Sequence, residues 1–371
     1  MHIPDGYLSP STCAVFYGAA APFWYIASRR VKALFLTRFI PLVSVFGAFS
    51  FVIMMFNIPI PGGTTAHALG VGIAAIVLGP WASTLAVTTA LLIQAVFFGD
   101  GGITTFGANS FNMAIVGSLV AYLAYRALAG RAPLSSARRV IAAALAGYVA
   151  INAAALCASV ELGLQPLLFK SATGAPLYAP YPLRVAVPAI MLAHLTLAGA
   201  AELIVTGGVV AYLQRANPAL LRLTAPHAPA DPGHASSVPH AGAWSGTRPL
   251  LGALALLLLL TPLGILAAGT AWGEWGVRDF SNPLARQRIM SASHNVALPA
   301  RAPRGLAHLS RIWTAPFPSY APAFVREPAF GYLLSAMFGA GVIILLALLA
   351  TWAASRRRVI SSGADARAEE A

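Results

Sequence analysis

Residues 64–98 read TTAHALGVGIAAIVLGPWASTLAVTTALLIQAVFF, an unbroken run without a single Asp, Glu, Lys or Arg. A membrane-spanning helix needs about 20 mainly apolar residues, because the hydrocarbon core of a bilayer is roughly 30 Å thick. The run is too long for one crossing, and Gly79-Pro80 near its middle is a turn signal. We therefore predict two membrane helices joined by a turn, with lipid as their solvent.

The composition extends this prediction to most of the 371 residues. Hydrophobic residues make up 58% of the chain and charged residues only 9%, whereas a soluble domain carries about 25% charged residues. We expect an all-α polytopic membrane protein with about nine crossings. The uncharged runs that predict them are Gly6–Ser28, Phe39–Phe56, the two halves of Thr64–Phe98, Gly101–Tyr125, Val140–Val160, Val185–Gln214 (interrupted by Glu202), Pro249–Gly273 and Pro328–Ser355.

The Lys and Arg residues indicate how these crossings are oriented. Clusters lie between the first two spans, between the fifth and sixth, after the seventh and after the ninth. With the N-terminus outside, all of them fall on the cytoplasmic side, as the positive-inside rule requires. Segment 271–327 carries seven Arg residues yet falls outside, and long segments of this kind are translocated largely regardless of charge. We expect a multi-pass protein of the bacterial cytoplasmic (inner) membrane.

The net charge of +13 arises largely from the same clusters. No basic stripe follows an amphipathic element, so we expect membrane lipid and no nucleic acid as a partner. Cys13 and Cys157 belong to no CxxC pair, which argues against a thiolate metal site and against a disulfide framework. No charged region precedes the first apolar run, so we expect no cleaved signal peptide and a mature N-terminus at Met1.

Composition shifts divide the chain into unequal parts. Residues 1–214 hold seven predicted crossings and form a membrane domain. Residues 215–248, rich in Ala, Pro, His and Ser, predict a flexible cytoplasmic linker. Residues 249–358 form a helical pair around an outer loop, 271–327, and residues 359–371 predict a disordered cytoplasmic tail.

Two histidines fall in loops that this topology places at the outer face, His2 next to the N-terminus and His67 at the end of a Gly/Pro-rich loop. The α-amine of Met1, the backbone nitrogen of His2 and its ring Nδ1 can bind one ion through a five- and a six-membered chelate ring. A fourth nitrogen from His67 would complete a square plane. This geometry favours Ni(II) or Cu(II) and accepts Co(II) with strain, whereas Zn(II) prefers a tetrahedron.

The alternative is that these histidines are incidental, as a histidine at position 2 usually is. His67 carries more weight, because ionisable groups at the head of a membrane span are costly and tend to be functional. The ligand nitrogens must lose protons to bind a metal, so binding should weaken in acid.

The other polar residues of the spans are open to two readings each. Asp100 lies in Gly-Asp-Gly-Gly, which we interpret as an ordinary turn rather than as a cation attractor. Gln94, Asn109 and Asn112 are expected to bond between helices, and they could also orient the histidines.

Three further ionisable residues lie in or beside the spans. His194 and Glu202 are eight residues apart, hence near one helical face, and we favour a buried structural pair over a proton relay. Glu161 is expected at the interface. No Walker A loop, HExxH or GxSxG motif is present, so we expect a transporter subunit rather than an enzyme, with any ATP hydrolysis on partner chains.

Five blocks cover nearly all of residues 1–214: Met1-His2-Ile3-Pro4-Asp5-Gly6-Tyr7-Leu8-Ser9-Pro10, residues 59–70 (PIPGGTTAHALG), 98–104 (FGDGGIT), 107–114 (GANSFNMA) and 180–183 with the following helix to Gln214. Through these blocks the region resembles the nickel/cobalt substrate-specific (S) subunits of energy-coupling-factor (ECF) transporters. The resemblance implies a seven-helix bundle and, as metal ligands, the Met1 amine, the backbone and ring nitrogens of His2 and the ring of His67.

The resemblance also implies the partners and the substrate. Such subunits take Ni(II) or Co(II) as transported substrate, with no organic cofactor, and dock on a transmembrane coupling (T) subunit driven by two ATP-binding-cassette ATPases. Residues 249–358 resemble, on the blocks 271–276 and 331–336, the two-helix accessory component of these systems. The Pro-Asp-Gly-Leu-Glu signature of some fused C-terminal regions is missing, which leaves the detailed role of this part open.

We therefore expect a membrane subunit that captures Ni(II) or Co(II) at the outer face and releases it inside. The rival is a stand-alone secondary divalent-metal transporter in which His194 and Glu202 couple the metal to protons. A third reading is a structural membrane subunit that binds no metal.

Overall fold

The computed structural model describes residues 1–34, 40–226, 228–229, 248–267 and 269–369. Within them the chain is mostly helical and contains one antiparallel two-stranded sheet, β1 (Ile58–Ile60) with β2 (Thr64–Ala66). The α-helices are α1 (Pro10–Leu34), α2 (Ile40–Met54), α3 (Val71–Leu78), α4 (Pro80–Ile93), α5 (Phe106–Asn109), α6 (Gly117–Ala129), α7 (Ala137–Leu168), α8 (Leu183–Leu195), α9 (Leu197–Ala216), α10 (Pro218–Arg222), α11 (Arg248–Leu260), α12 (Pro283–Ala292), α13 (Arg304–Leu309) and α14 (Pro328–Glu369). The π-helices η1 (Gln94–Phe98) and η2 (Ser110–Val116) and the 3-10 helices η3 (Thr261–Leu266), η4 (Val277–Phe280) and η5 (Pro318–Tyr320) complete the set.

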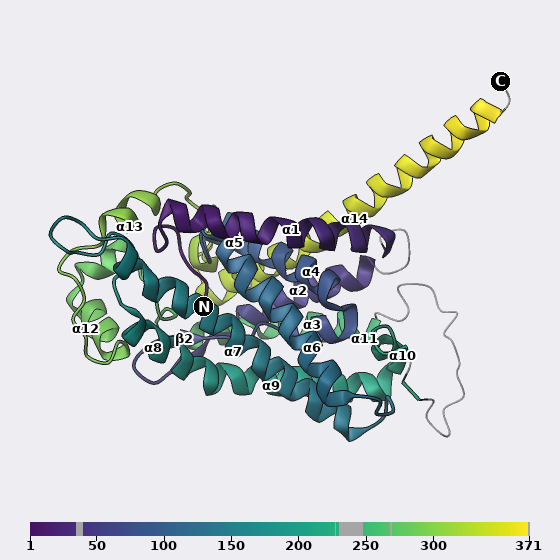
Figure 1. Cartoon of the computed structure of the whole chain (residues 1–371), viewed down its shortest axis with the longest axis horizontal. Helices are drawn as coiled ribbons and strands as arrows, with labels where there is room; N and C mark the ends of the chain where they lie inside the picture. Colours follow the sequence, from purple (N-terminus) through teal and green to yellow (C-terminus); the bar gives the residue numbers. More distant parts are fainter. Residues whose placement is uncertain (35–39, 227, 230–247, 268, 370–371) are drawn as a thin grey trace.

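The long helices run side by side along the long axis of the molecule, with α1 on one edge and α9 on the other (Figure 1). The segment that contains α12 and α13 caps one end, where the N-terminal residues also lie, and we call this the site end. The opposite end, with α10, is called the linker end. Helix α14 packs against α2 and then projects beyond the body of the bundle.

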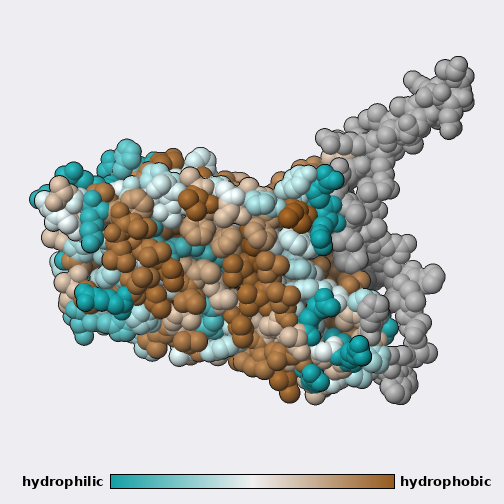
Figure 2. All heavy atoms as spheres, viewed as in Figure 1, coloured by the Kyte–Doolittle hydropathy of each residue, from teal (hydrophilic) through white to brown (hydrophobic). Residues whose placement is uncertain are grey.

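Among the described residues, five helical stretches are long and apolar enough to cross a membrane, and two shorter apolar helices, Ile40–Met54 and Leu250–Leu266, accompany them. Large apolar side chains such as Ile204 (68% exposed) and Leu123 (61% exposed) point outward, because lipid rather than water surrounds them. Figure 2 shows the resulting apolar belt between two polar ends. The prediction of an all-α polytopic membrane protein is confirmed.

The third predicted crossing is not a full helix. Helix α3 has only 8 residues, about 12 Å at 1.5 Å per residue. The chain reaches it through a non-helical stretch, 64–70, that spans at most about 23 Å. The stretch begins beside Ala271 at the site end, and α3 ends near Thr224 at the linker end. The nearly continuous apolar sequence of residues 64–78 therefore forms a strand, a loop and a short helix, all of them buried inside the bundle.

The seventh predicted crossing is broken as well. Its helices α8 and α9 meet at Thr196, whose backbone angles (φ −107°, ψ −105°) are not helical. The first predicted crossing is one helix, α1, which is long but lies outside the five apolar stretches because it carries several polar residues and a basic end. Glu161, expected at the interface, is buried within α7.

Helices lie within three of the segments that the sequence predicts as linker, loop or tail. Residues 218–222 of the predicted linker form α10, which packs on α9, while residues 227 and 230–247 of that linker lie outside the described residues. The predicted outer loop, 271–327, contains η4, α12, α13 and η5. Helix α14 runs to Glu369 and so includes most of the stretch predicted as a tail.

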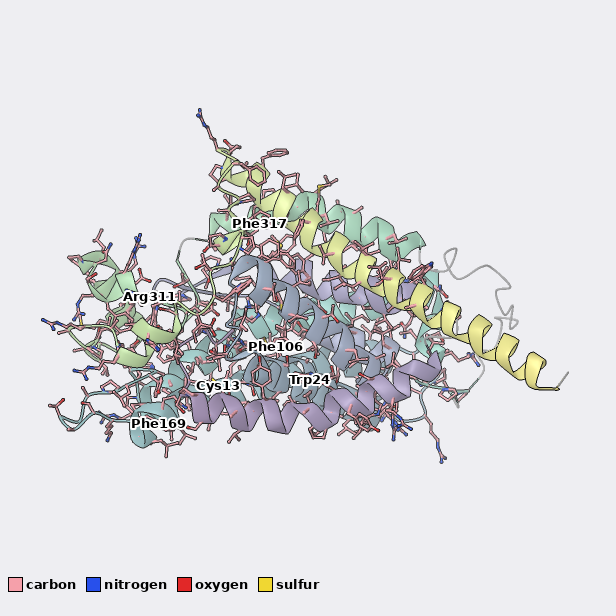
Figure 3. The ribbon with its side chains drawn as sticks, turned by 90° about the horizontal axis from the view of Figure 1, so that it is seen from above. Cys13, Trp24, Phe106, Phe169, Arg311 and Phe317 are labelled. Atoms are coloured by element: carbon pink, nitrogen blue, oxygen red, sulfur yellow. The ribbon has the colours of Figure 1, made fainter. Side chains whose placement is uncertain are left out.

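The packing of α1 on the bundle fixes one side of the site end. The rings of Trp24 and Phe106 stack at 5.5 Å between α1 and α5 (Figure 3). A Cβ at Gly107 would lie 2.6 Å from the backbone nitrogen of Tyr17, so only glycine allows this approach of the two helices. The Tyr17 hydroxyl donates to the carbonyl oxygen of Ile103 at 2.6 Å, which ties α1 to the loop between η1 and α5.

Candidate metal centre

The first residues of the chain lie inside the molecule rather than on its surface. Met1, His2 and Ile3 are 4%, 2% and 0% exposed. The backbone of Ile3 is held on both sides by the Asn109 side chain, whose Oδ1 accepts from the Ile3 nitrogen at 2.8 Å and whose Nδ2 donates to its oxygen at 3.0 Å. The Gly102 nitrogen donates to the same oxygen at 3.0 Å. The backbone that leads into His2 is therefore fixed by the bundle.

Asp5 joins this N-terminal segment to the loop after η1. Its carboxylate accepts from the backbone nitrogens of Thr104 at 2.7 Å and of Ile103 at 3.1 Å. A Cβ at Gly102 would lie 2.4 Å from the Asp5 nitrogen, so the two backbones are in direct contact. The Gly-rich loop 99–105 thus serves to receive the N-terminal segment, with Gly99 and Gly101 in left-handed conformations.

His67 reaches the same place from the β-hairpin. Strand β2 ends at Ala66, and the next residue, His67, is 5% exposed. Its ring Nδ1 lies 3.1 Å from the carbonyl oxygen of Ala68. Because a carbonyl oxygen only accepts, Nδ1 carries the proton, and in the neutral ring the lone pair is on Nε2. His67 is therefore oriented to offer Nε2 as a ligand.

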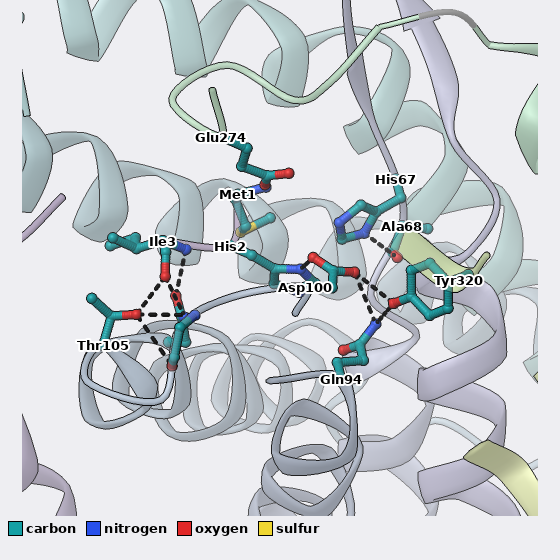
Figure 4. A network of polar contacts seen from close by, with 12 residues as sticks. Met1, His2, Ile3, His67, Ala68, Gln94, Asp100, Thr105, Glu274 and Tyr320 are labelled. Carbon is teal, nitrogen blue, oxygen red and sulfur yellow. Dashed lines mark hydrogen bonds and ion pairs between the residues drawn. The ribbon is translucent and has the colours of Figure 1, made fainter. Parts of the chain in front are cut away.

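The rings of His2 and His67 lie beside each other, with centroids 5.1 Å apart and planes 43° apart (Figure 4). They are separated by more than sixty positions in the sequence and meet because the N-terminal segment, the hairpin and the loop 99–105 converge at the site end. The structure thus brings together the three residues, Met1, His2 and His67, that the sequence singles out as ligands.

Asp100 belongs to this cluster, although the sequence favours a simple turn at that position. Its Oδ1 contacts His2 Nδ1, and its Oδ2 accepts from the Tyr320 hydroxyl at 2.6 Å and from Gln94 Nε2 at 3.4 Å. Burial acts to raise the pKa of Asp100, but the His2 charge and the hydrogen bonds from His2 and Tyr320 outweigh burial and hold that pKa below its ordinary value. Asp100 is therefore an anion next to the predicted chelate.

Glu274 supplies a second carboxylate, from the C-terminal part of the chain. Its Oε1 lies 3.3 Å from the Met1 amine. Burial raises the pKa of Glu274, against the opposing attraction of the amine. The neighbouring Trp275 carbonyl accepts from the Tyr7 hydroxyl at 2.7 Å. Glu274 lies in one of the blocks of family resemblance, yet nothing in the local sequence indicates that it faces Met1.

Residues 269–327, which we call the cover, close the site end over these groups. A cavity of about 620 Å³ lies between the cover and the bundle, and its lining includes His67 and Asp100 from the bundle and Glu274 and Tyr320 from the cover. The rings of Phe98 and Tyr320 stack at 4.6 Å and form one wall. The cavity gives the cluster a polar, acidic approach suited to a cation.

Side chains alone do not complete a metal site in the described part of the chain, where no three His, Cys, Asp or Glu residues lie close enough to share an ion. The additional donors at this place are the Met1 amine and the backbone nitrogen of His2. Both cysteines are free, and Cys13 lies buried in α1. Together with the two imidazole rings, these nitrogens are the candidate donors of the cluster.

The predicted pairing of His194 with Glu202 is wrong. His194 Nδ1 lies 2.7 Å from the Ile190 carbonyl oxygen, within its own helix. Glu202 accepts from backbone nitrogens near the start of α3 instead. The prediction assumes one continuous helix, but the helix is broken at Thr196, and residues on opposite sides of the break do not share one face.

A family model described as the cobalt uptake substrate-specific transmembrane region matches residues 2–220. The chain belongs to this family. The resemblance predicted from residues 1–214 is confirmed, and the chain is a multi-pass membrane protein of metal transport.

Relatives of the cobalt-uptake family extend the match to the C-terminal part. A fused nickel transport protein of Rhodobacter capsulatus is 56% identical over 93% of this chain and 95% of its own length. A probable fused nickel transport protein of Lactiplantibacillus plantarum is 40% identical over 93% of this chain and 96% of its own length. The substrate-specific region is therefore followed by a second part in the same chain, as in these relatives.

A solved crystal structure described as a transition metal transporter is 54% identical. It matches 58% of this chain and 93% of its own length with a TM-score of 0.55. The helical arrangement of the matched part of the chain is thus shared with this solved transporter.

Proposed function

We propose that this chain captures Ni(II) or Co(II) as its transported substrate through four nitrogens: the Met1 amine, the backbone nitrogen and ring Nδ1 of His2, and Nε2 of His67. The observation that carries the proposal is the 5.1 Å approach of the two imidazole rings inside a buried pocket that also contains the Met1 amine. The nickel and cobalt names of the family and its relatives support the choice of ion.

Chelation in this manner requires the nitrogens to change partners. His2 Nδ1 must leave Asp100, the Met1 amine must leave Glu274 and lose one proton, and the backbone amide of His2 must lose its proton. The two carboxylates remain beside the ion and offset its charge, because a divalent ion bound by one ionised amide keeps a net positive charge. Proton release makes the affinity fall in acid.

We further propose that the chain works in the inner membrane as the substrate-specific subunit of an ECF transporter. In this arrangement residues 249–358 act as the accessory part, and the energy comes from a T subunit with two ATP-binding-cassette ATPases. The support is the match of the family model to residues 2–220 and the fused organisation of the relatives.

The chelate is tested by adding one alanine before Met1 and, separately, by the substitution His2→Ala. Both changes remove donors, so nickel bound per purified chain should fall to background. The matched control is His294→Ala, which removes an exposed histidine of the cover far from the ligand set in sequence. Unchanged nickel binding by the extended protein would refute the N-terminal chelate.

The energy source is tested by nickel uptake in cells that contain this chain but lack the ATPases. The ECF proposal expects no uptake beyond binding, and ATPase-independent uptake would favour the secondary transporter. That rival assigned proton coupling to a His194–Glu202 pair, and these two residues have separate partners.

A further inference from the structure

The stretch between His67 and α3 passes through the interior of the bundle without helical hydrogen bonds of its own. Residues 67–72 are all buried. Inside a membrane protein, non-helical backbone is tolerated only where the protein supplies partners for its polar groups, since lipid offers none. The partners of this stretch therefore determine where His67 is held.

Glu202 of α9 supplies those partners. Its Oε2 accepts from the backbone nitrogens of Leu69 at 2.7 Å and Gly70 at 2.9 Å. Its Oε1 accepts from the Gly72 nitrogen at 3.1 Å and from the Thr206 hydroxyl at 3.4 Å. Three of these four donors are backbone N–H groups, which only donate and therefore need an acceptor such as a carboxylate oxygen. The side chain is 0% exposed and lies at the N-terminus of α3, where the helix dipole favours a negative group.

Glycines make this contact sterically possible. Gly70 has a left-handed backbone (φ +67°), which turns successive nitrogens toward one point. A Cβ at Gly72 would lie 2.5 Å from Thr206 Oγ1 and 2.8 Å from the Cα of Gly147 in α7. The backbone at the start of α3 therefore lies in direct contact with α7 and α9. This contact explains why glycine occupies positions 70 and 72.

The constraint continues from Glu202 to the ligand atom of His67. The carboxylate fixes the backbone at Leu69, which is bonded directly to Ala68. The carbonyl oxygen of Ala68 then accepts from His67 Nδ1, which sets the rotation of the ring and leaves the lone pair on Nε2. Each step is a covalent bond or a hydrogen bond between buried groups.

We propose that Glu202 is the positioning residue that fixes His67 for the transported ion. It contacts the α3 N-terminus and does not itself bind the metal. The proposal rests on the proposed function, in which His67 Nε2 is the fourth ligand. It assigns to Glu202 a role in metal affinity that its place in the membrane-spanning region does not by itself suggest.

The test compares Glu202→Gln with Glu202→Asp in the full-length protein. Glutamine keeps the shape but presents an amide NH2 to donors, so it cannot hold three backbone nitrogens. Aspartate keeps the charge on a shorter side chain. For Glu202→Gln we expect nickel affinity to fall by about 10- to 100-fold, the cost typical of outer-shell partners, together with a shifted ligand-field absorption band of bound nickel. Glu202→Asp should recover part of both.

A second measurement does not depend on the metal. Hydrogen exchange of the amides of Leu69, Gly70 and Gly72 should accelerate in Glu202→Gln before nickel is added. The matched control is Thr206→Val, which removes only the 3.4 Å contact and should leave affinity, absorption band and exchange close to those of the unchanged protein.

The outcomes separate this proposal from the proposed function. If His67→Ala abolishes nickel binding but Glu202→Gln accelerates exchange without changing affinity or the absorption band, Glu202 is structural and the inference is overturned. If His67→Ala leaves nickel binding intact, the proposed ligand set fails whatever Glu202 does. Should Glu202→Gln not fold, the same comparison is made with Glu202→Asp, where an unchanged band and affinity despite faster exchange would overturn the inference.

Discussion

The bundle and the cover hold the residues of the candidate metal centre in different ways. The bundle holds backbone groups: Asn109 bonds both sides of Ile3, and Glu202 bonds the stretch after His67. The cover holds charged groups through side chains: Glu274 lies against the Met1 amine, and Tyr320 donates to the carboxylate that contacts His2. None of these backbone contacts occupies a ligand atom, whereas the contacts of Glu274, from the cover, and of Asp100, from the bundle, do.

This difference indicates which contacts can remain in place when the ion is bound. Bonds to the backbone of Ile3 or of Leu69 leave the ligand nitrogens available and keep their geometry. The contact of Glu274 with the amine, and that of Asp100 with Nδ1, must be exchanged for the ion. We infer that the backbone contacts of the bundle set affinity and that the cover, through Glu274, acts mainly on how readily the Met1 amine is released. The predictions below test this division.

The largest effect is expected for His67→Ala. Removal of a direct ligand should lower nickel affinity more than the roughly 10- to 100-fold that outer-shell changes cost, so a loss beyond about 100-fold is expected. Equilibrium dialysis of the purified protein measures it, with His308→Ala in α13 as a control for loss of an exposed histidine. A loss smaller than tenfold would remove His67 from the ligand set.

A smaller effect is expected for Asn109→Ala, which removes the two Asn109 bonds to the backbone of Ile3. The substitution removes the acceptor of the Ile3 nitrogen, at about 1–3 kcal/mol for a buried group left unsatisfied, while the Ile3 oxygen keeps Gly102 and Thr105 as donors. We expect nickel affinity to fall by about 10-fold or more and the thermal unfolding midpoint to drop. Affinity unaltered in a destabilised Asn109→Ala protein would contradict the role given to the bundle.

The cover should matter less for affinity. Glu274→Gln and Tyr320→Phe remove partners of Met1 and Asp100 but leave these two residues in place, and the Glu274 side chain keeps 19% exposure although the Met1 amine is buried. Such pairs contribute up to about 1 kcal/mol, which corresponds to about fivefold in affinity. We expect equilibrium affinities within that range, but faster nickel binding in stopped-flow measurements of Glu274→Gln. A loss of affinity comparable to that of Asn109→Ala would show that the comparison between bundle and cover is mistaken.

The smallest effect concerns pH and distinguishes the two carboxylates. The pKa of Asp100 lies below its ordinary value and that of Glu274 above, so on acidification Glu274 takes up its proton first. Below the ordinary pKa of Asp100, stability that depends on its ionised form is lost as the pH falls. For Glu274, the folded state takes up its proton at a higher pH than the unfolded state, so stability is gained as the pH falls through the raised value.

Infrared difference spectra taken during acidification measure this order. The carbonyl stretch of a protonated carboxyl should appear first from Glu274, should be missing in Glu274→Gln and should persist in Asp100→Asn. If the first band came from Asp100 instead, Glu274 of the cover, and not Asp100 of the bundle, would be the carboxylate that stays ionised to lower pH.

Much of the fold follows from composition and from hydrophobic run length. Runs such as Val140–Val160 and Pro328–Ser355 are long, apolar and uncharged, and each lies within one continuous helix, α7 or α14. The run Thr64–Phe98 shows the limit of this reasoning. Gly79-Pro80 does separate two elements there, but apolar composition cannot distinguish a membrane helix from buried strand and loop, since both avoid charge.

The candidate site divides in the same manner. Met1, His2 and His67 can be named from sequence because their chemistry is local: an amine next to a histidine forms a chelate wherever it lies. Asp100 and Glu274 cannot be interpreted in this way. Gly-Asp-Gly-Gly around Asp100 is also a common turn sequence, and Trp-Gly-Glu-Trp around Glu274 does not show which residue the carboxylate contacts in the fold.

The sequence by itself therefore determined that this is a membrane protein related to metal-transport subunits, with a histidine at position 2 that can act as a ligand. Only the tertiary structure decided that His67 meets His2, that Glu274 meets an amine 273 positions away, and that Glu202 faces the start of α3 rather than His194. The physical reason is that solvent preference and chelating chemistry are properties of single residues and short segments. Which backbone lies opposite a buried carboxylate depends instead on how helices pack, on a break at Thr196 and on glycines that let α3, α7 and α9 touch.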